Sequence, residues 1–401
     1  MTSTALGPTT ARRVAFGSIL ALTMAGSTFA FTTFSVLSTP LLETFDIDRW
    51  QLGALVTAAA TLGAVLSPPV GRVADRIGGR NALLTTLALS AASLAAIAAA
   101  PAYLLIVAGA LVAGAAQAGA NPSTNKLIGM HGDAGNRGTL TGIKQAGVQV
   151  GVFLGGALLP LGATTIGWRQ TLLVAATLPL LGLLAARRLL PADLPDDVGD
   201  VPSTDPHLGT VRSPFLRRLA TYGFLLGTGW SAVFTYLPDY GQHALGWSPA
   251  VTGLLVSAAG ICGIAGRIGW SRLAERRLGS PTTLLVIATI SVAAVAAVLA
   301  APAVPALLWL GAAALGGSSG SWNSVGMFAI IERLPQRAAG GASGIVMFGF
   351  LIGLGLGAPV FGWSVDVTGT YTVGLLATAA VHVLGVGLAL ALRRSDAGAG
   401  R

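Results

Sequence analysis

Long apolar stretches separated by short polar segments form the dominant pattern of this sequence. A helix needs about 20 consecutive apolar residues to cross the hydrocarbon core of a bilayer. Twelve stretches approach or exceed that length, and they are residues 14–37, 52–71, 82–100, 104–127, 139–163, 170–186, 219–237, 250–270, 282–301, 305–331, 341–364 and 372–392. They lack the alternating polar positions of a barrel strand, and lipid leaves no backbone group unpaired. The pattern therefore predicts an all-α membrane protein with twelve transmembrane helices.

The composition excludes an ordinary water-soluble protein. Of the 401 residues 53% are hydrophobic and 10% are charged, whereas charged residues make up about 25% of soluble proteins. The net charge of +9 would fit a nucleic-acid-binding protein only if the basic residues shared one wetted face, but they are scattered between the apolar runs. Cys262 is the only cysteine, so a disulfide within the chain is excluded.

Basic residues are distributed unequally between the two sets of alternate connections. Nineteen of the 24 fall in one set, and only Arg49 and Arg169 fall in the other. Because basic loops stay in the cytoplasm, we expect both termini to be cytoplasmic. High usage of alanine, glycine and arginine is typical of GC-rich bacterial genomes, so the expected location is the bacterial inner (plasma) membrane.

A segment rich in proline and aspartate, residues 187–218, divides the twelve runs into two groups of six. Such a composition cannot bury an apolar core, so we expect a flexible cytoplasmic linker. The expected organisation is a cytoplasmic N-terminal tail (1–13), a six-helix bundle (14–186), the linker (187–218), a second six-helix bundle (219–392) and a cytoplasmic C-terminal tail (393–401).

The two groups of runs resemble each other in sequence. Ten of the twenty-eight residues in 53–80 are identical to those 200 positions later. At a shift of 202, Asn121 matches Asn323, and the glycines at 147, 151 and 155 match those at 349, 353 and 357. Internal repeats of this kind are typical of transporters with two pseudo-symmetric bundles, in which the substrate site lies near the middle of the membrane.

The loop between the second and third runs carries a recognisable motif, formed by Gly71, Asp75, Arg76, Gly78 and Arg80. These residues resemble the signature GxxxDRxGxR of the major facilitator superfamily. Arg272, Glu275 and Arg276 resemble its degenerate second copy. Gly79 stands where the family usually has a basic residue. The resemblance covers the whole chain by its number of spans, and it implies two six-helix lobes that rock about a central cavity.

The same resemblance implies a role for the motif carboxylates. Asp75 would face the start of span eleven near Gly340, and pseudo-symmetry would place Glu275 near Thr139 at the start of span five. A carboxylate at a helix N-terminus is stabilised by the helix dipole. We therefore expect these contacts to hold the cytoplasmic side closed, although a purely local loop role is the alternative.

Two basic residues, Lys144 and Arg267, fall inside predicted spans, where charges are costly and are usually functional. Either side chain could instead extend along its helix to the cytoplasm. All fifteen acidic residues fall in loops, tails or span ends, so two cations without an acidic partner favour an anionic ligand. Oxalate/formate and monocarboxylate carriers of the superfamily place a basic residue on span eight, and Arg267 is the residue here that resembles it.

Uncharged polar residues are expected to complete a hydrated path. Gln117, Asn121 and Asn125 recur every four residues and so share one helix face, and Gln145 and Gln149 do the same beside Lys144. Such a stripe would be costly against lipid. The candidate substrate-binding residues are Lys144, Arg267, Asn121, Gln145, Gln149, Asn323, Gln117, Trp230 and Tyr236. For the two aromatic residues, packing is an equally good interpretation.

Several other residues have a structural interpretation. The repeated glycines lie at the spacing that lets helices approach closely. The antiporter motif of the superfamily's drug exporters falls on the fifth span but has proline directly after a glycine, whereas Pro160 follows Gly156 by four residues. His382, near the middle of the last span, is better explained as a hydrogen-bonded structural residue than as a proton carrier.

The sequence contains no metal-ligand spacing, nucleotide-binding loop or nucleophile triad, so we expect neither an enzyme nor a resident cofactor. The predicted function is a secondary active transporter, monomeric in the bilayer, that moves a small organic anion such as a mono- or dicarboxylate by alternating access. No contact with nucleic acid is expected. Two alternatives stay open, which are an exporter of drugs or metabolites and a membrane receptor that binds its ligand without transporting it.

Overall fold

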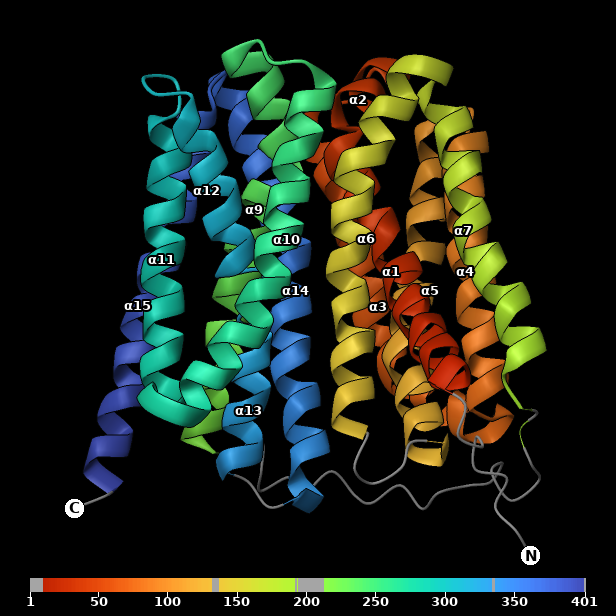
Figure 1. Cartoon of the computed structure of the whole chain (residues 1–401). Coiled ribbons are helices and arrows are strands. Elements are labelled where there is room, and N and C mark those ends of the chain that lie inside the picture. The colour runs from red at the N-terminus through yellow and green to blue at the C-terminus, as the bar shows by residue number, and fades with distance from the viewer. Residues whose placement is uncertain (1–9, 132–136, 192, 194–212, 334–335, 400–401) are drawn as a thin grey trace, which may run out of the picture. The chain divides into compact units, whose positions relative to one another are not determined.

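The computed structural model describes residues 10–131, 137–191, 193, 213–333 and 336–399, and every element in these ranges is helical. The first half contains α1 (Thr10–Val36), α2 (Ser38–Phe45), α3 (Arg49–Ile77), α4 (Gly79–Ala99), α5 (Tyr103–His131), α6 (Arg137–Ile166) and α7 (Trp168–Leu189). The second contains α9 (Pro214–Leu245), α10 (Pro249–Leu273), the π-helix η2 (Ala274–Leu278), α11 (Ser280–Ala300), α12 (Ala306–Gly317), α13 (Asn323–Arg333), α14 (Gln336–Thr368) and α15 (Tyr371–Ala399) (Figure 1).

The predicted all-helical membrane fold is confirmed. Ten of the described helices are long and apolar enough to cross a membrane. The predicted run 305–331 is divided between α12 and α13, and α9 extends the predicted run 219–237 to Leu245.

The chain folds into two compact units. Of the described residues, the first unit contains those up to 33 and those from 61 to 193, and the second contains 34–60 and everything from 213 onwards. In the first unit α4 packs between α5 and α7, and in the second unit α9 packs against α14 and α15. The helix α3 therefore begins in the second unit and continues into the first.

Residues 34–60 belong to the second unit, whereas the predicted first bundle included them. The Ser35 hydroxyl donates to the carbonyl of Phe234 over 2.5 Å. Gly53 lies so close to the backbone of Pro359 that an added Cβ would overlap it. These contacts, together with a charged cluster described below, attach the end of α1 to α9 and the start of α3 to α9 and α14.

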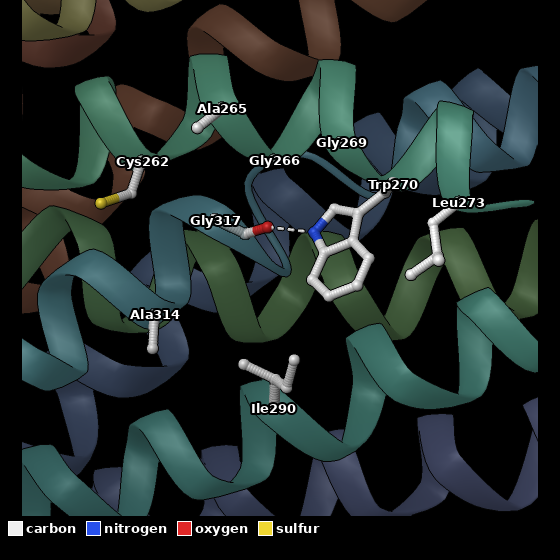
Figure 2. A pocket seen from close by; sticks show the side chains of 9 residues that line it. All are labelled: Cys262, Ala265, Gly266, Gly269, Trp270, Leu273, Ile290, Ala314 and Gly317. Carbon is white, nitrogen blue, oxygen red and sulfur yellow. Dashed lines mark hydrogen bonds between the residues drawn. The ribbon is translucent and has the colours of Figure 1, made fainter.

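The break between α12 and α13 has a local cause in a run of serine and glycine (Figure 1). The hydroxyls of Ser318, Ser319 and Ser321 each donate to the carbonyl three or four residues earlier, so side chains replace part of the helical ladder. The carbonyl of Gly317 also accepts the indole N–H of Trp270 over 2.5 Å (Figure 2). Backbone groups freed by the break are thereby satisfied within the protein, as lipid requires.

Backbone conformation confirms the internal repeat. The described residues with positive φ form three pairs, which are Asp46 with Gly246, Gly78 with Gly279, and Gly167 with Gly369. The separations are 200, 201 and 202 residues, as in the sequence repeat. Turns that need the same left-handed backbone thus recur at equivalent places in both halves.

The repeated glycines have the predicted packing role. In the first unit a Cβ on Gly147 or Gly151 would overlap or crowd the backbone of α1 at Ala21 or Ala25. In the second unit a Cβ on Gly353 or Gly357 would overlap the backbone of α9 at Phe224 or Thr228. Both helix pairs therefore approach backbone to backbone, which only glycine permits.

The linker aspartate Asp193 lies against the motif loop of the first unit. Its carboxylate accepts the backbone N–H of Arg80 over 3.0 Å and of Asn81 over 3.1 Å, so it caps the start of α4. Gly78, which has φ of 89°, lies so close to this carboxylate that an added Cβ would overlap it. Gly78 thus permits both the positive φ of the turn and the close approach of the Asp193 carboxylate that caps α4.

Glycine contacts predict a difference between two substitutions in the same helix. Gly353→Ala should lower the melting temperature of the detergent-solubilised protein, because overpacking a close helix contact costs about 1–3 kcal/mol. Gly344→Ala, where an added Cβ meets nothing within 4 Å, should leave the melting temperature unchanged or raise it. Thermal unfolding followed by tryptophan fluorescence measures both. Equal melting temperatures for the two variants would show that the contact of α14 with α9 tolerates a methyl group.

Candidate functional site

Lys144 is the most unusual charged residue of the first unit. Its side chain projects from α6 and is 1% exposed, so it does not reach solvent along its helix. The ammonium group donates to Asn121 Oδ1 (3.1 Å), to Thr124 Oγ1 (3.2 Å) and to Asn125 Oδ1 (2.5 Å), all on α5. The amine is therefore held by three neutral oxygens.

Charge balance around Lys144 is incomplete within the described part of the chain. The ion pairs found there do not include Lys144, so no described carboxylate lies within 4.0 Å of its ammonium group. Burying a cation without a counter-charge is costly, and neutral dipoles recover only part of that cost. The position can therefore accept a negative charge.

The polar stripe of α5 faces α6, as the four-residue spacing predicts. Asn121 also accepts a hydrogen bond from Gln145 Nε2 at 3.5 Å. Gln149, one turn further along α6, is 3% exposed. The carbonyl oxygen of Gln117 is buried and has no hydrogen-bond partner in the described structure. Three of the candidate residues, Lys144, Asn121 and Gln145, thus meet at the contact of α5 with α6.

The second unit contains the other predicted cation and its neighbours. Arg267 lies on α10, which packs against α12 and α13, and its Nε is buried. Asn323 begins α13, and its side-chain oxygen is buried without a hydrogen-bond partner among the described atoms. The indole N–H of the neighbouring Trp322 is also buried without a hydrogen-bond partner among the described atoms. Unsatisfied polar atoms of this kind are typical of sites that take a polar ligand or water.

The two aromatic candidates are engaged in packing. Trp230 stacks on Phe234 with ring centroids 4.4 Å apart. Tyr236 stacks on Phe361 at 5.3 Å, and its hydroxyl donates to the carbonyl of Arg49. Tyr236 therefore holds the start of α3, which the sequence did not indicate.

Residues on both sides of Arg267 in the sequence line an open apolar pocket. It has a volume of about 470 Å³ and is formed by α10, α11 and α12 (Figure 2). Its lining includes Cys262, Gly269, Trp270 and Ile290, and none of its lining residues is charged. This pocket does not suit an anion.

The residues of the motif between α3 and α4, and those of its second copy, are only partly described. Arg76 is exposed, and a Cβ on Gly71 would meet nothing within 4 Å. In the second copy Arg272, Glu275 and Arg276 are exposed, and the last two lie in the π-helix η2. The side chains of Asp75 and Thr139 and the surroundings of Gly340 are not described, so both predicted latch contacts stay predictions.

The second unit contains a charged cluster that the sequence does not indicate. Asp239 lies beyond the end of the predicted span 219–237, but α9 continues to Leu245 and Asp239 is fully buried within it. Asp239 Oδ2 accepts Arg49 Nε at 2.8 Å and the Tyr371 hydroxyl at 2.5 Å. Asp366 accepts the backbone N–H of Arg49 at 3.3 Å. The one available signal was Arg49 itself, an arginine in the connections that have almost none.

His382 lies in a closely packed part of the second unit. His382 is buried on α15, with Nδ1 3.0 Å from the carbonyl of Thr378, and its ring packs against Gly229. This environment fits the structural interpretation. Among the described residues, no group of three or more histidine, cysteine or acidic side chains is arranged to hold a metal ion.

Comparison with known proteins adds independent information. The sequence model of the Major Facilitator Superfamily matches residues 20–310, which is more than half of the chain. Monocarboxylate transporter 13 of Rattus norvegicus is 27% identical over 258 residues, and the same protein of Bos taurus is 26% identical over 257. Each match covers 64% of this chain, and the chain spans about 60% of the length of these two relatives.

Solved structures show the same fold at low identity. The chain resembles a bacterial homologue of the human lysosomal transporter Spinster, in an inward-facing and occupied conformation, with a TM-score of 0.75 and 17% identity. That match covers 96% of this chain and 98% of the other. The nucleoside transporter NupG matches with a TM-score of 0.77 and 15% identity over 95% and 98% of the two chains. The helices, the internal repeat and the match to the family model lead to one conclusion, which is that this chain belongs to the Major Facilitator Superfamily and is a multi-pass membrane protein.

Proposed function

We propose that this chain is a secondary transporter that moves a small organic anion, such as a mono- or dicarboxylate, by alternating access. Its expected place is the bacterial inner membrane, as a monomer with both termini in the cytoplasm. The observation that carries the proposal is the buried ammonium group of Lys144, which contacts three neutral oxygens and no described carboxylate.

The physical reason is charge complementarity. A carboxylate that reaches Lys144 replaces an ion–dipole contact with an ion pair, and hydrogen bonds between charged groups are worth about 1.5–3 kcal/mol. Arg267 is the second anion anchor in this proposal. Asn121, Gln145, Gln149 and Asn323 would select the ligand through hydrogen bonds, because amide groups can both donate and accept.

The named relatives support the same substrate class. Two of the proteins that this chain resembles are named monocarboxylate transporters. A drug exporter with an apolar cavity would gain nothing from a buried ammonium group, which disfavours that alternative. The test below separates the two.

Removal of the positive charge at Lys144 should abolish most anion uptake. For Lys144→Gln we expect about a ten- to a hundredfold loss in uptake of labelled formate, oxalate, lactate or pyruvate into proteoliposomes, which corresponds to one lost charged hydrogen bond. Lys144→Arg, which keeps the charge, should retain more activity. Arg188→Ala, which removes an exposed charge at the end of α7, should transport like the unmodified protein.

The controls make this experiment decisive. Comparable melting temperatures for the variants show that the folded population is unchanged. If no carboxylate is transported, or if Lys144→Gln transports as well as the unmodified protein, the anion proposal is wrong. Uptake of neutral or cationic drugs that survives the substitution would then support the exporter.

A second substitution tests whether the missing counter-charge is what recruits the substrate. Asn125→Asp places a carboxylate at the position of an oxygen that is 2.5 Å from the Lys144 amine. The internal ion pair should compete with the substrate, so we expect uptake to fall as in Lys144→Gln while the melting temperature stays equal or rises. Normal uptake in Asn125→Asp would show that the charge of Lys144 is not used for binding. Proteoliposome uptake and thermal unfolding provide the two measurements.

A further inference from the structure

Lys144 is covered by side chains that are more exposed than it is. The lysine is 1% exposed. Asn121 and Asn125, which accept two of its hydrogen bonds, are exposed residues of α5. The third acceptor, Thr124, is buried. An anion that approaches from outside the first unit therefore meets the two amides before it can reach the ammonium group.

The hydrogen-bonding capacity of the ammonium group is fully used. A lysine ammonium has three N–H donors and no acceptor. Asn121, Thr124 and Asn125 each supply one side-chain oxygen, at 3.1, 3.2 and 2.5 Å from Lys144 Nζ. An incoming anion can therefore form a full hydrogen bond with Lys144 only if one of these three oxygens leaves.

The three acceptors differ in how easily they can leave. The Thr124 hydroxyl also donates to the carbonyl of Ala120 over 2.6 Å, so the position of its oxygen is fixed by its own helix. Asn125 forms the shortest of the three contacts, at 2.5 Å. The contact of Asn121 is longer and belongs to an exposed side chain, and exposed side chains change rotamer within picoseconds to nanoseconds. Asn121 is thus the acceptor that is replaced most easily.

Two donors of α6 converge on the side-chain oxygen of Asn121. Lys144 Nζ lies 3.1 Å from this oxygen, and Gln145 Nε2 lies 3.5 Å from it. If the Asn121 side chain turns away, both donors stay directed at the place that its oxygen occupied. A carboxylate can accept several hydrogen bonds through its two oxygens. The place between Lys144 and Gln145 therefore suits one carboxylate group.

From this arrangement we infer that Asn121 covers Lys144 when no substrate is bound, and that the substrate carboxylate binds by replacing the Asn121 oxygen between Lys144 and Gln145. The inference rests on the proposed function, because it assigns a binding step to the anion anchor of that transporter. Hydrogen bonds between ionised partners are roughly twice as strong as neutral ones, so a carboxylate gains from the exchange. A neutral solute lacks this advantage, so Asn121 selects for charge through the contact that the ligand must replace.

The competing interpretation is a direct contact between the Asn121 amide and the bound substrate. Loss of a ligand contact weakens binding, whereas loss of a cover strengthens it. The two interpretations therefore predict opposite effects of the same substitution, Asn121→Ala.

Chemical labelling of lysine measures the cover directly. Lys126 and Lys144 are the only lysines of the chain, so mass spectrometry separates their reactions with the small neutral reagent N-acetoxysuccinimide. In the detergent-solubilised protein, Asn121→Ala should raise the acetylation rate of Lys144 about three- to tenfold, which corresponds to the net value of one hydrogen bond. Lys126, whose ammonium group donates to the carbonyl of Ala74, is the internal reference and should react at an unchanged rate.

Protection of Lys144 by substrate measures binding in the same samples. The concentration of formate, oxalate, lactate or pyruvate that halves the labelling rate should be about three- to tenfold lower in Asn121→Ala than in the unmodified protein. In Asn121→Asp this concentration should be higher, because the introduced carboxylate stays beside the ammonium group. Gln145→Ala should also raise it, because one donor is lost, but should leave labelling without substrate unchanged.

A matched variant and a matched ligand serve as controls. Thr164→Ala removes a hydroxyl that donates to a carbonyl of its own helix, α6, and this variant should label and bind like the unmodified protein. Lactamide, which has the shape of lactate without its charge, should not protect Lys144. Equal protection by lactamide and lactate would show that charge does not drive the exchange, and the inference would be wrong.

The remaining outcomes separate this inference from the proposed function. If Asn121→Ala needs more carboxylate for protection than the unmodified protein, Asn121 is a ligand contact rather than a cover. An unchanged labelling rate of Lys144 in Asn121→Ala would also overturn the inference. If none of the four carboxylates protects Lys144 in any variant, but Asn121→Ala still labels faster, the proposed substrate is wrong and the cover stands.

Discussion

Hydrocarbon offers no hydrogen-bond partner, and most of the polar detail of this structure follows from that constraint. Serine and threonine hydroxyls inside the helices donate back to carbonyls three or four residues earlier, as Thr23, Thr86 and Ser123 do. Arg169 donates to the carbonyls of Ala98 and Ala100 at the end of α4, where the helical ladder leaves them free. The break in α12 is tolerated because nearby hydroxyls and the indole of Trp270 take up the released groups.

The buried charges of Lys144 and Asp239 are stabilised in different ways, by neutral dipoles in one case and by an ion pair in the other. Lys144 is surrounded by neutral oxygens, so its charge is stabilised but remains available to an incoming anion. Asp239 is paired with Arg49, so its charge is used in a contact within the protein. A buried ion pair loses its stabilising partner when one member is neutralised. The first arrangement suits binding of an anion, and the second suits attachment of one helix to another.

The sequence predicted those features that depend on local pattern. Apolar runs located the helices, the four-residue spacing of Asn121 and Asn125 oriented α5 toward α6, and the repeated glycines marked close helix contacts. Burial of Asp239 could not be predicted in this way, because hydropathy falls at Pro238 and Asp239 although the helix continues to Leu245. Its partner Arg49 lies 190 residues away, and the contact exists only after the chain has folded.

The internal repeat extends to the scaffold but not to Lys144, Arg49 and Arg267. Left-handed turns and close glycine contacts recur in both halves. The residue equivalent to Lys144 at a shift of 202 is the buried Val346, and the residues equivalent to Arg49 and Arg267 at a shift of 200 are Pro249 and Ser67. A duplicated charge would require a duplicated partner, because an unmatched charge in a buried position is costly. The two halves can therefore share their packing although their buried charges differ. The repeat accounts for where helices meet, and the single-copy charges account for the chemical difference between the halves.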